Sequence, residues 1–131
     1  MRVLVDTHCW LWQLGEPHRL GQQARTVLSS PENEVFFSAA SAWEIVIKHT
    51  LGRLSLPSPP AEYIPSRMAA LGNLSLPVAQ THVLRVAALP LHHKDPFDRV
   101  LIAQALVEGL TLITVDPVMR MYEAPIIWAA Q

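Results

Sequence analysis

The sequence predicts an α/β fold with a central parallel β-sheet covered by helices on both faces. Short apolar segments alternate with helix-like segments along the chain, a pattern typical of βαβ units. Two of the apolar segments, 2–5 and 110–115, end directly at an acid, Asp6 and Asp116. In sheets of this kind the working site lies outside the carboxyl ends of the strands. The folding pattern and the acids therefore indicate the same edge of the sheet.

In the first half of the chain, strands are recognised as short apolar runs rich in β-branched or aromatic residues. Helices are recognised by apolar residues at a spacing of three and four. The segment Gly15-Glu16-Pro17 breaks the first helix, and Gly52 is a natural stop for the third. These criteria predict strands over 2–5 and 34–38 and helices over 7–14, 21–30 and 41–51.

Prolines mark the connections in the second half. The stretch 57–60, Pro-Ser-Pro-Pro, is interpreted as a loop and not as a domain linker. Pro65 weakens or bends the helix expected over 61–71, and Pro77 places the strand expected over 74–78 at a sheet edge. The remaining expected elements are helices over 80–88 and 97–108, strands over 110–115 and 125–128, and a short turn or helix that starts at Asp116-Pro117.

Length and composition indicate a single domain over residues 1–131. The formal net charge of −1 excludes a global basic footprint, so a nucleic acid would have to be held by a local patch or by bound metal. Cys9 is the only cysteine; we interpret it as a small core residue, and an intrachain disulfide is impossible. No apolar stretch approaches the ~20 residues of a membrane span. We therefore expect a cytoplasmic protein without a membrane segment.

The strongest functional signal is a set of acids that lie far apart in the sequence: Asp6, Glu44, Asp98 and Asp116. The chain has only 11 acidic residues, so these positions hold a large share of them. A cluster of carboxylates repels itself and is costly to fold unless a cation neutralises it. Oxygen ligands suit Mg²⁺ or Mn²⁺ rather than zinc. The pattern predicts a metal-dependent phosphodiesterase.

Each acid also has a purely structural interpretation. Asp6 and Asp116 are good helix caps, and Asp98 lies in a first helical turn, where the macrodipole favours negative charge. The segment Ser41-Ala42-Trp43-Glu44 matches a capping box, in which the glutamate bonds back to the backbone. Asp95 stands before a proline, so we expect it to be the helix cap or an outer-shell partner of the ligand Asp98.

Several other polar residues are candidates for supporting roles. Thr7 and Thr114 are placed to orient carboxylates or water through their hydroxyls. Arg99 or Lys94 is expected to steady the scissile phosphate. The adjacent pair His92-His93 lacks the spacing of a zinc motif, and we interpret it as part of a surface or substrate-side loop.

Four segments carry a family resemblance over residues 1 to about 128. They are Val5-Asp6-Thr7-His8, Ser41-Ala42-Trp43-Glu44-Ile45, the long segment 93–105 and Thr114-Val115-Asp116. They resemble the successive motifs of PIN-domain nucleases, and more narrowly of VapC-type toxins from bacterial type II toxin–antitoxin pairs. The long segment is specific, whereas each short one is weak by itself.

The resemblance implies a PIN-like three-layer fold whose parallel sheet has about five strands in the order 3-2-1-4-5. It implies an acidic site at Asp6, Glu44, Asp98 and Asp116, with Thr114 as a polar neighbour. It also implies Mg²⁺ or Mn²⁺ as cofactor, RNA as substrate, a homodimer, and a small cognate antitoxin that inhibits the enzyme.

Two alternatives from other classes stay open at this point. In the first, the chain is a non-catalytic RNA- or protein-binding module whose acids are only helix caps, so that it binds no metal. In the second, the metal is retained but the substrate is DNA or a phosphomonoester. A phosphoaspartyl phosphatase needs an Asp-x-Asp motif after the first strand, where this chain has Asp6-Thr7-His8.

Overall fold

The chain folds around one sheet of five parallel strands. In a computed structural model, which describes residues 1–130, the strands lie in the order β3-β2-β1-β4-β5, and every pairing is parallel. The predicted α/β class and the strand order are confirmed. The strands are β1 (Arg2–Val5), β2 (Glu34–Ser38), β3 (Leu74–Leu76), β4 (Thr111–Thr114) and β5 (Ile126–Trp128).

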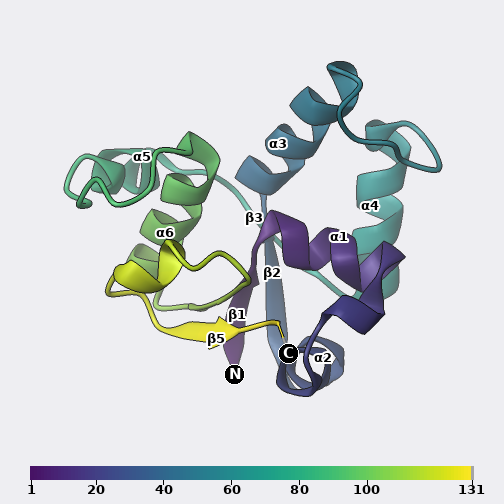
Figure 1. The fold of residues 1–131 in the computed structure, drawn as a ribbon, viewed down its shortest axis with the longest axis horizontal. Helices are drawn as coiled ribbons and strands as arrows, with labels where there is room; N and C mark the ends of the chain where they lie inside the picture. Colours follow the sequence, from purple (N-terminus) through teal and green to yellow (C-terminus); the bar gives the residue numbers. More distant parts are fainter. Residues whose placement is uncertain (131) are drawn as a thin grey trace.

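Helices cover both faces of this sheet and complete the predicted three layers. Figure 1 shows α5 and α6 on one side and α1, α2 and α4 on the other. The helices are α1 (Thr7–Gly15), α2 (Gln22–Ser29), α3 (Ala39–Thr50), α4 (Pro60–Leu71), α5 (Gln80–Val86) and α6 (Pro96–Glu108), with short 3-10 segments η1 (Pro17–Arg19) and η2 (Met119–Met121). No helix within residues 1–130 has the length and hydropathy to cross a bilayer.

The side chains of β1 explain why this strand contains no polar residue after the exposed Arg2. Val3 and Val5 join the core on one face of the sheet, and Leu4 joins the core on the other. All three are fully buried, and burial of each contributes on the order of 1.5–3 kcal/mol. Because both faces are covered, an alternating polar pattern would be destabilising here. The next polar residue, Asp6, marks the edge of the sheet.

Helix α3 begins earlier than predicted, and this corrects the capping-box interpretation. Its N-cap is Ser38, whose side chain accepts a hydrogen bond from the Ala40 backbone N–H. Ser41 therefore lies inside the helix. Glu44 is too far along α3 to bond back to the helix start, so its carboxylate is available for another role.

The prolines behave largely as expected. Pro65 lies inside α4, which continues through it, and Pro60 occupies the first turn of that helix. The strand β3 lies at the edge of the sheet, as predicted, and ends just before Pro77. The edge position of β3 leaves the central strands β1 and β4 to position the acids.

Candidate metal centre

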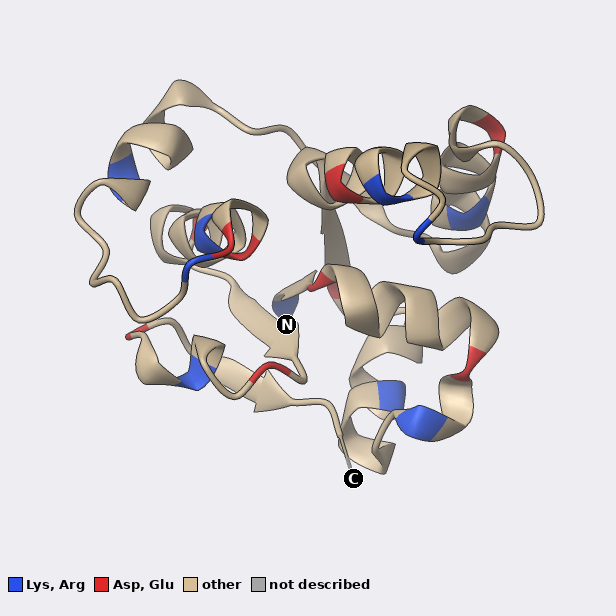
Figure 2. Ribbon diagram, turned by 45° about the horizontal axis from the view of Figure 1, so that its top comes forward, with Lys and Arg blue, Asp and Glu red and all other residues tan. Residues whose placement is uncertain are grey.

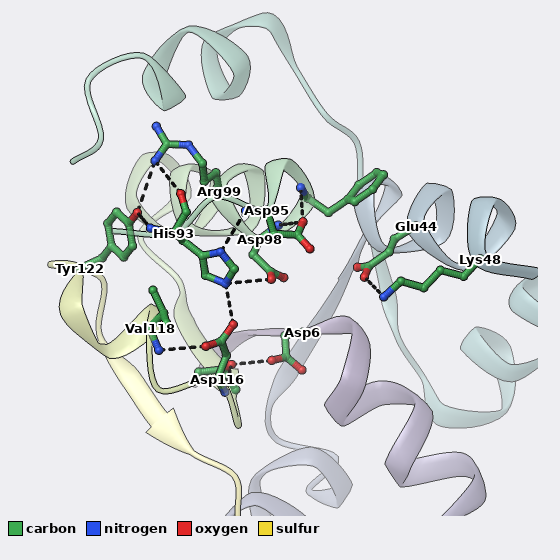
Figure 3. Close-up of polar contacts among 12 residues, drawn as sticks. Asp6, Glu44, Lys48, His93, Asp95, Asp98, Arg99, Asp116, Val118 and Tyr122 are labelled. Atoms are coloured by element: carbon green, nitrogen blue, oxygen red, sulfur yellow. Dashed lines mark hydrogen bonds and ion pairs between the residues drawn. The ribbon is translucent and has the colours of Figure 1, made fainter. Parts of the chain in front are cut away.

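Acidic side chains from four elements meet at the carboxyl edge of the sheet. Asp6 follows β1, Asp116 follows β4, and Glu44 lies on α3, the helix that follows β2. Asp98 lies in the first turn of α6. Figure 2 shows acidic positions at the starts of α1 and α6 and within α3 on the same side of the molecule. In Figure 3 the labelled carboxylates surround one space, with Glu44 approaching from α3.

Asp6 is the most firmly held of these acids. Its Oδ1 accepts a hydrogen bond from the Cys9 backbone N–H at 2.7 Å, and its Oδ2 accepts one from the Thr114 hydroxyl. Burial raises the pKa of the Asp6 carboxyl above its ordinary value, while the hydrogen bonds from Thr114 and Cys9 oppose that shift. Thr114 therefore orients a carboxylate, as the sequence predicted.

Asp98 and Asp116 both contact a histidine of the loop before α6. The Nε2 atom of His93 lies 2.6 Å from Oδ2 of Asp116 and 3.1 Å from Oδ2 of Asp98. The side chain of His93 is only 14% exposed, so of the two predicted positions the surface loop is wrong for this histidine, and a loop that faces the site agrees with the structure. One signal was available: His93 is the first residue of the long segment that carries the family resemblance.

The protonation of Asp98 reports how closely the acids approach one another. Burial, followed by the charges of Asp95, Glu44, Asp6 and Asp116, raises the pKa of Asp98 to about 8. Like charges that share a site disfavour the ionised form of each carboxyl. The acids that follow β1 and β4 and the acid on α3 all contribute to the raised pKa of Asp98. A cation bound among these carboxylates would lower the pKa of Asp98 again.

Glu44 provides a direct test of whether the site suits a metal. It is 2% exposed, and its Oε2 accepts from the Lys48 ammonium at 2.6 Å. Its Oε1 is buried and has no hydrogen-bond partner among the described residues. A buried carboxylate oxygen without a partner is costly. A donor set of carboxylate oxygens fits Mg²⁺ or Mn²⁺, so the residues present suit such an ion.

Two of the predicted supporting residues have structural roles. The side chain of Asp95 accepts hydrogen bonds from the backbone N–H groups of Phe97 and Asp98, which confirms it as the cap of α6. The Thr7 hydroxyl donates to the Ser41 hydroxyl at 2.9 Å and so joins α1 to α3. Thr7 does not orient a carboxylate directly, in contrast to the expectation.

Arg99 does not face the acids. Its guanidinium donates to the backbone oxygens of Val86 at 3.0 Å and Pro90 at 2.9 Å, and the residue is only 9% exposed. The expectation that Arg99 contacts a phosphate is therefore corrected: its donors hold the loop between α5 and α6. Lys94, on the same loop, is exposed and stays a candidate for that contact.

Comparison with known proteins gives one family. The family model of the PIN domain matches residues 3–124. Ribonuclease VapC16 from Mycobacterium tuberculosis is 42% identical over 60 residues, which cover 46% of this chain and 43% of that protein. Ribonuclease VapC22 from the same organism is 27% identical over 125 residues, covering 94% of this chain and 93% of that protein.

Solved structures with a similar fold include a toxin–antitoxin complex from Klebsiella pneumoniae, with a TM-score of 0.63 at 18% identity and 96% coverage of each chain. VapBC2 from Rickettsia felis, bound to a DNA fragment from its promoter, superposes with a TM-score of 0.72 at 10% identity, covering 98% of each chain. VapBC-1 from nontypeable Haemophilus influenzae gives a TM-score of 0.63 at 16% identity and 97% coverage of each chain. At these identities the likeness establishes the fold.

Proposed function

Because this chain belongs to the PIN domain family, we propose that it is a divalent-metal-dependent endoribonuclease. In this proposal Asp6, Glu44, Asp98 and Asp116 hold Mg²⁺ or Mn²⁺ at the carboxyl edge of the sheet. The observation that carries the proposal is the geometry of the acids: Asp98 and Asp116 both contact Nε2 of His93, Asp6 accepts from Thr114, and the buried Oε1 of Glu44 has no partner among the described residues. The curated relatives, both named as ribonucleases, support RNA as the substrate class.

The chemistry that a bound divalent ion supplies is an activated water and neutralisation of the charge on the phosphate. The protein contributes the rest. Thr114 fixes the Asp6 carboxylate through its hydroxyl, and Lys48 holds one oxygen of Glu44, which leaves the other free. Burial of Asp6 and Glu44 to 2% exposure keeps bulk water from screening these charges. Lys94 is exposed nearby to receive a phosphate.

In the non-catalytic alternative, the acids of this site are only helix caps. Two acids do act as helix caps, Asp6 for α1 and Asp95 for α6, and Asp116 accepts from the Val118 backbone N–H in the turn before η2. Glu44 and Asp98, however, cap nothing. Asp98 is buried beside like charges, and Lys48 pairs with only one oxygen of Glu44, so both acids are costly to bury without a further cation. This cost favours a metal centre over a set of caps.

The test is cleavage of a structured RNA and of the matched DNA, with Mg²⁺, with Mn²⁺ and with EDTA. Asp6→Asn is the variant, and His18→Ala, at an exposed position of η1, is the control. We expect RNA cleavage only with metal, and a loss of at least about 100-fold in the variant, which is on the order of 2.7 kcal/mol of transition-state stabilisation. Undiminished cleavage by Asp6→Asn contradicts the proposal, and DNA cleavage at equal rate contradicts the substrate.

We further propose that the protein is the toxin of a toxin–antitoxin pair and is inhibited by its cognate antitoxin. One of the similar structures, from Klebsiella pneumoniae, is described as a toxin–antitoxin complex, which supports such a partner. A candidate surface is a groove of about 490 Å³ between α1 and the loop before α4, lined by apolar residues that include Leu11, Trp12 and Leu56. We expect expression of the chain alone to arrest bacterial growth. Coexpression with the protein that the neighbouring open reading frame encodes should relieve that arrest. Harmless expression of the chain alone contradicts the toxin role.

A homodimer completes the proposal, as the family resemblance implies. The mass of the purified chain by analytical ultracentrifugation tests it directly. A mass of twice the chain's 14.6 kDa supports a dimer, and a monomer at micromolar concentration contradicts it.

A further inference from the structure

We propose that His93 is a positioning residue of the metal centre, which donates its Nε2 proton to Asp116, contacts Asp98 with the same nitrogen and stays outside the coordination sphere of the ion. The inference rests on the proposed function, because it concerns how the ligands of that same centre are held. It assigns a role to a side chain that lies within ligand distance of the acids but whose hydrogen bonds prevent it from binding the ion.

The ring of His93 has a fixed tautomer. The backbone N–H of Asp95 lies 3.1 Å from Nδ1 of His93, and a backbone N–H can only donate. Nδ1 must therefore accept, so the proton of the neutral ring is on Nε2. That N–H faces Oδ2 of Asp116 at 2.6 Å and Oδ2 of Asp98 at 3.1 Å.

A metal bond to Nε2 would require this arrangement to break. The protonated nitrogen has no free lone pair in the ring plane, so it cannot ligate an ion. Moving the proton to Nδ1 would place two N–H groups, those of the ring and of Asp95, against each other. Oxygen donors from Asp98 and Asp116 are also the ligands that Mg²⁺ and Mn²⁺ prefer. His93 therefore orients the carboxylates, and the carboxylates coordinate the ion.

The loop that carries His93 is held from both sides. The Tyr122 hydroxyl accepts from the His93 backbone N–H at 2.8 Å and donates to the Pro90 carbonyl at 2.8 Å. Arg99 donates to that same carbonyl and to that of Val86. Figure 3 shows Arg99 and Tyr122 on the far side of His93 from the acids. These contacts fix the ring between Asp98 and Asp116 before any ion binds.

Nitrogen NMR of the wild-type protein tests the inference directly. Uniformly ¹⁵N-labelled protein is titrated with Mg²⁺ while two-bond ¹H–¹⁵N spectra report which ring nitrogen of His93 carries the proton. We expect Nε2 to stay protonated at saturation. Loss of the Nε2 proton, or proton transfer to Nδ1, as Mg²⁺ binds overturns the proposal. Absence of any Mg²⁺-dependent change at the backbone amides of 95–99 instead overturns the metal centre itself.

Two substitutions then separate positioning from ligation. His93→Gln retains an N–H donor near the place of Nε2, whereas His93→Ala removes it. We expect Mn²⁺ affinity, measured by calorimetry, to fall by about 10- to 100-fold in His93→Ala, the usual effect of losing a group that orients a metal ligand. The Gln variant should recover most of that loss, and His18→Ala should match the wild type. Equal losses in the Gln and Ala variants, or no loss in either, contradict the positioning role.

Discussion

At the scale of single residues, Asp98 is buried among like charges that disfavour its ionised form. Burial and four neighbouring acids act on it in the same direction and raise its pKa to about 8. Asp6 is shifted upward as well, chiefly by burial. A protein would not gain stability from such an arrangement, so the cost is best explained by a ligand that the acids bind together.

The raised pKa of Asp98 predicts how the metal-free protein responds to pH. An unfolded aspartate ionises near pH ~3.9, whereas the folded Asp98 holds its proton up to about pH 8. The folded state thus binds the proton of Asp98 more tightly than the unfolded state does. The stability that this difference in proton binding provides is fully present below pH ~3.9 and is lost as the pH rises toward 8. Asp98→Asn, which cannot ionise, should gain at least about 1.4 kcal/mol relative to the wild type over this range.

Urea denaturation in EDTA at a series of pH values measures that difference. The comparison with Asp98→Asn measures the titration of Asp98 together with its effect on the neighbouring acids. A wild type that gains stability over Asp98→Asn as the pH rises contradicts the raised pKa.

At the scale of elements, the loop between α5 and α6 and the start of α3 decide where the functional groups lie. The loop presents His93, and Arg99 holds the loop through the Val86 and Pro90 carbonyls. The start of α3 is set by Ser38, whose hydroxyl also donates to the side-chain oxygen of Gln104 on α6 at 2.6 Å. Glu44 is carried to the site by that helix.

Arg99→Lys should destabilise the protein although it keeps the charge. A lysine has one ammonium in place of the planar fork and cannot satisfy both carbonyls at once. A buried carbonyl left without a donor costs roughly 1–3 kcal/mol, and we expect a loss of that size in urea denaturation. Arg53→Lys, at an exposed position, is the matched control. Equal stability of Arg99→Lys and the wild type would show that these contacts contribute nothing.

Ser38→Ala should weaken the start of α3. It removes both the cap on the Ala40 backbone N–H and the bond to Gln104, and loss of an N-cap alone costs about 1 kcal/mol. We expect a lower urea midpoint. We also expect weaker Mn²⁺ binding, because Glu44 lies on this helix and is positioned by it. Ser66→Ala, whose hydroxyl is exposed on α4, should change neither quantity.

At the scale of the whole molecule, the strand order brings the acids together. With β1 and β4 adjacent at the centre and β2 beside β1, the residues that follow these strands emerge at one edge. Asp6 and Asp116 thus become neighbours although 110 positions separate them in the sequence. The site is a consequence of the topology, and no local segment contains it.

Mg²⁺ binding should therefore stabilise the whole fold. An ion present at 100 times its dissociation constant, and bound only by the folded state, adds about 2.7 kcal/mol to the free energy of unfolding, or roughly 10 °C in the melting temperature of a chain of this size. Calorimetry with Mg²⁺ and then with excess EDTA measures the gain and its reversal. A melting temperature that is the same in both contradicts a shared ion.

Much of this molecule was predictable from its sequence, and the failures have physical reasons. Residues 3–5 are buried on both faces and include no polar side chain, so β1 and the acid after it were evident. The start of α3 was misplaced because Ser38 and Ser41 are both plausible caps, and only the end of β2 decides between them. Arg99 was misassigned, and the sequence left the position of His93 open between the surface and the substrate side, because both roles depend on a loop whose course is set by tertiary contacts. The charge of Arg99 suggested a phosphate contact, but the side chain is buried and its donors bond to backbone carbonyls.

The most direct test of the central claim is the anomalous difference density of a crystal of this protein soaked in Mn²⁺. We predict a peak at the carboxyl edge of the sheet, coordinated by oxygens drawn from Asp6, Glu44, Asp98 and Asp116. A well-ordered site with no Mn²⁺ peak among these carboxylates, or a peak ligated by residues elsewhere, would contradict the account.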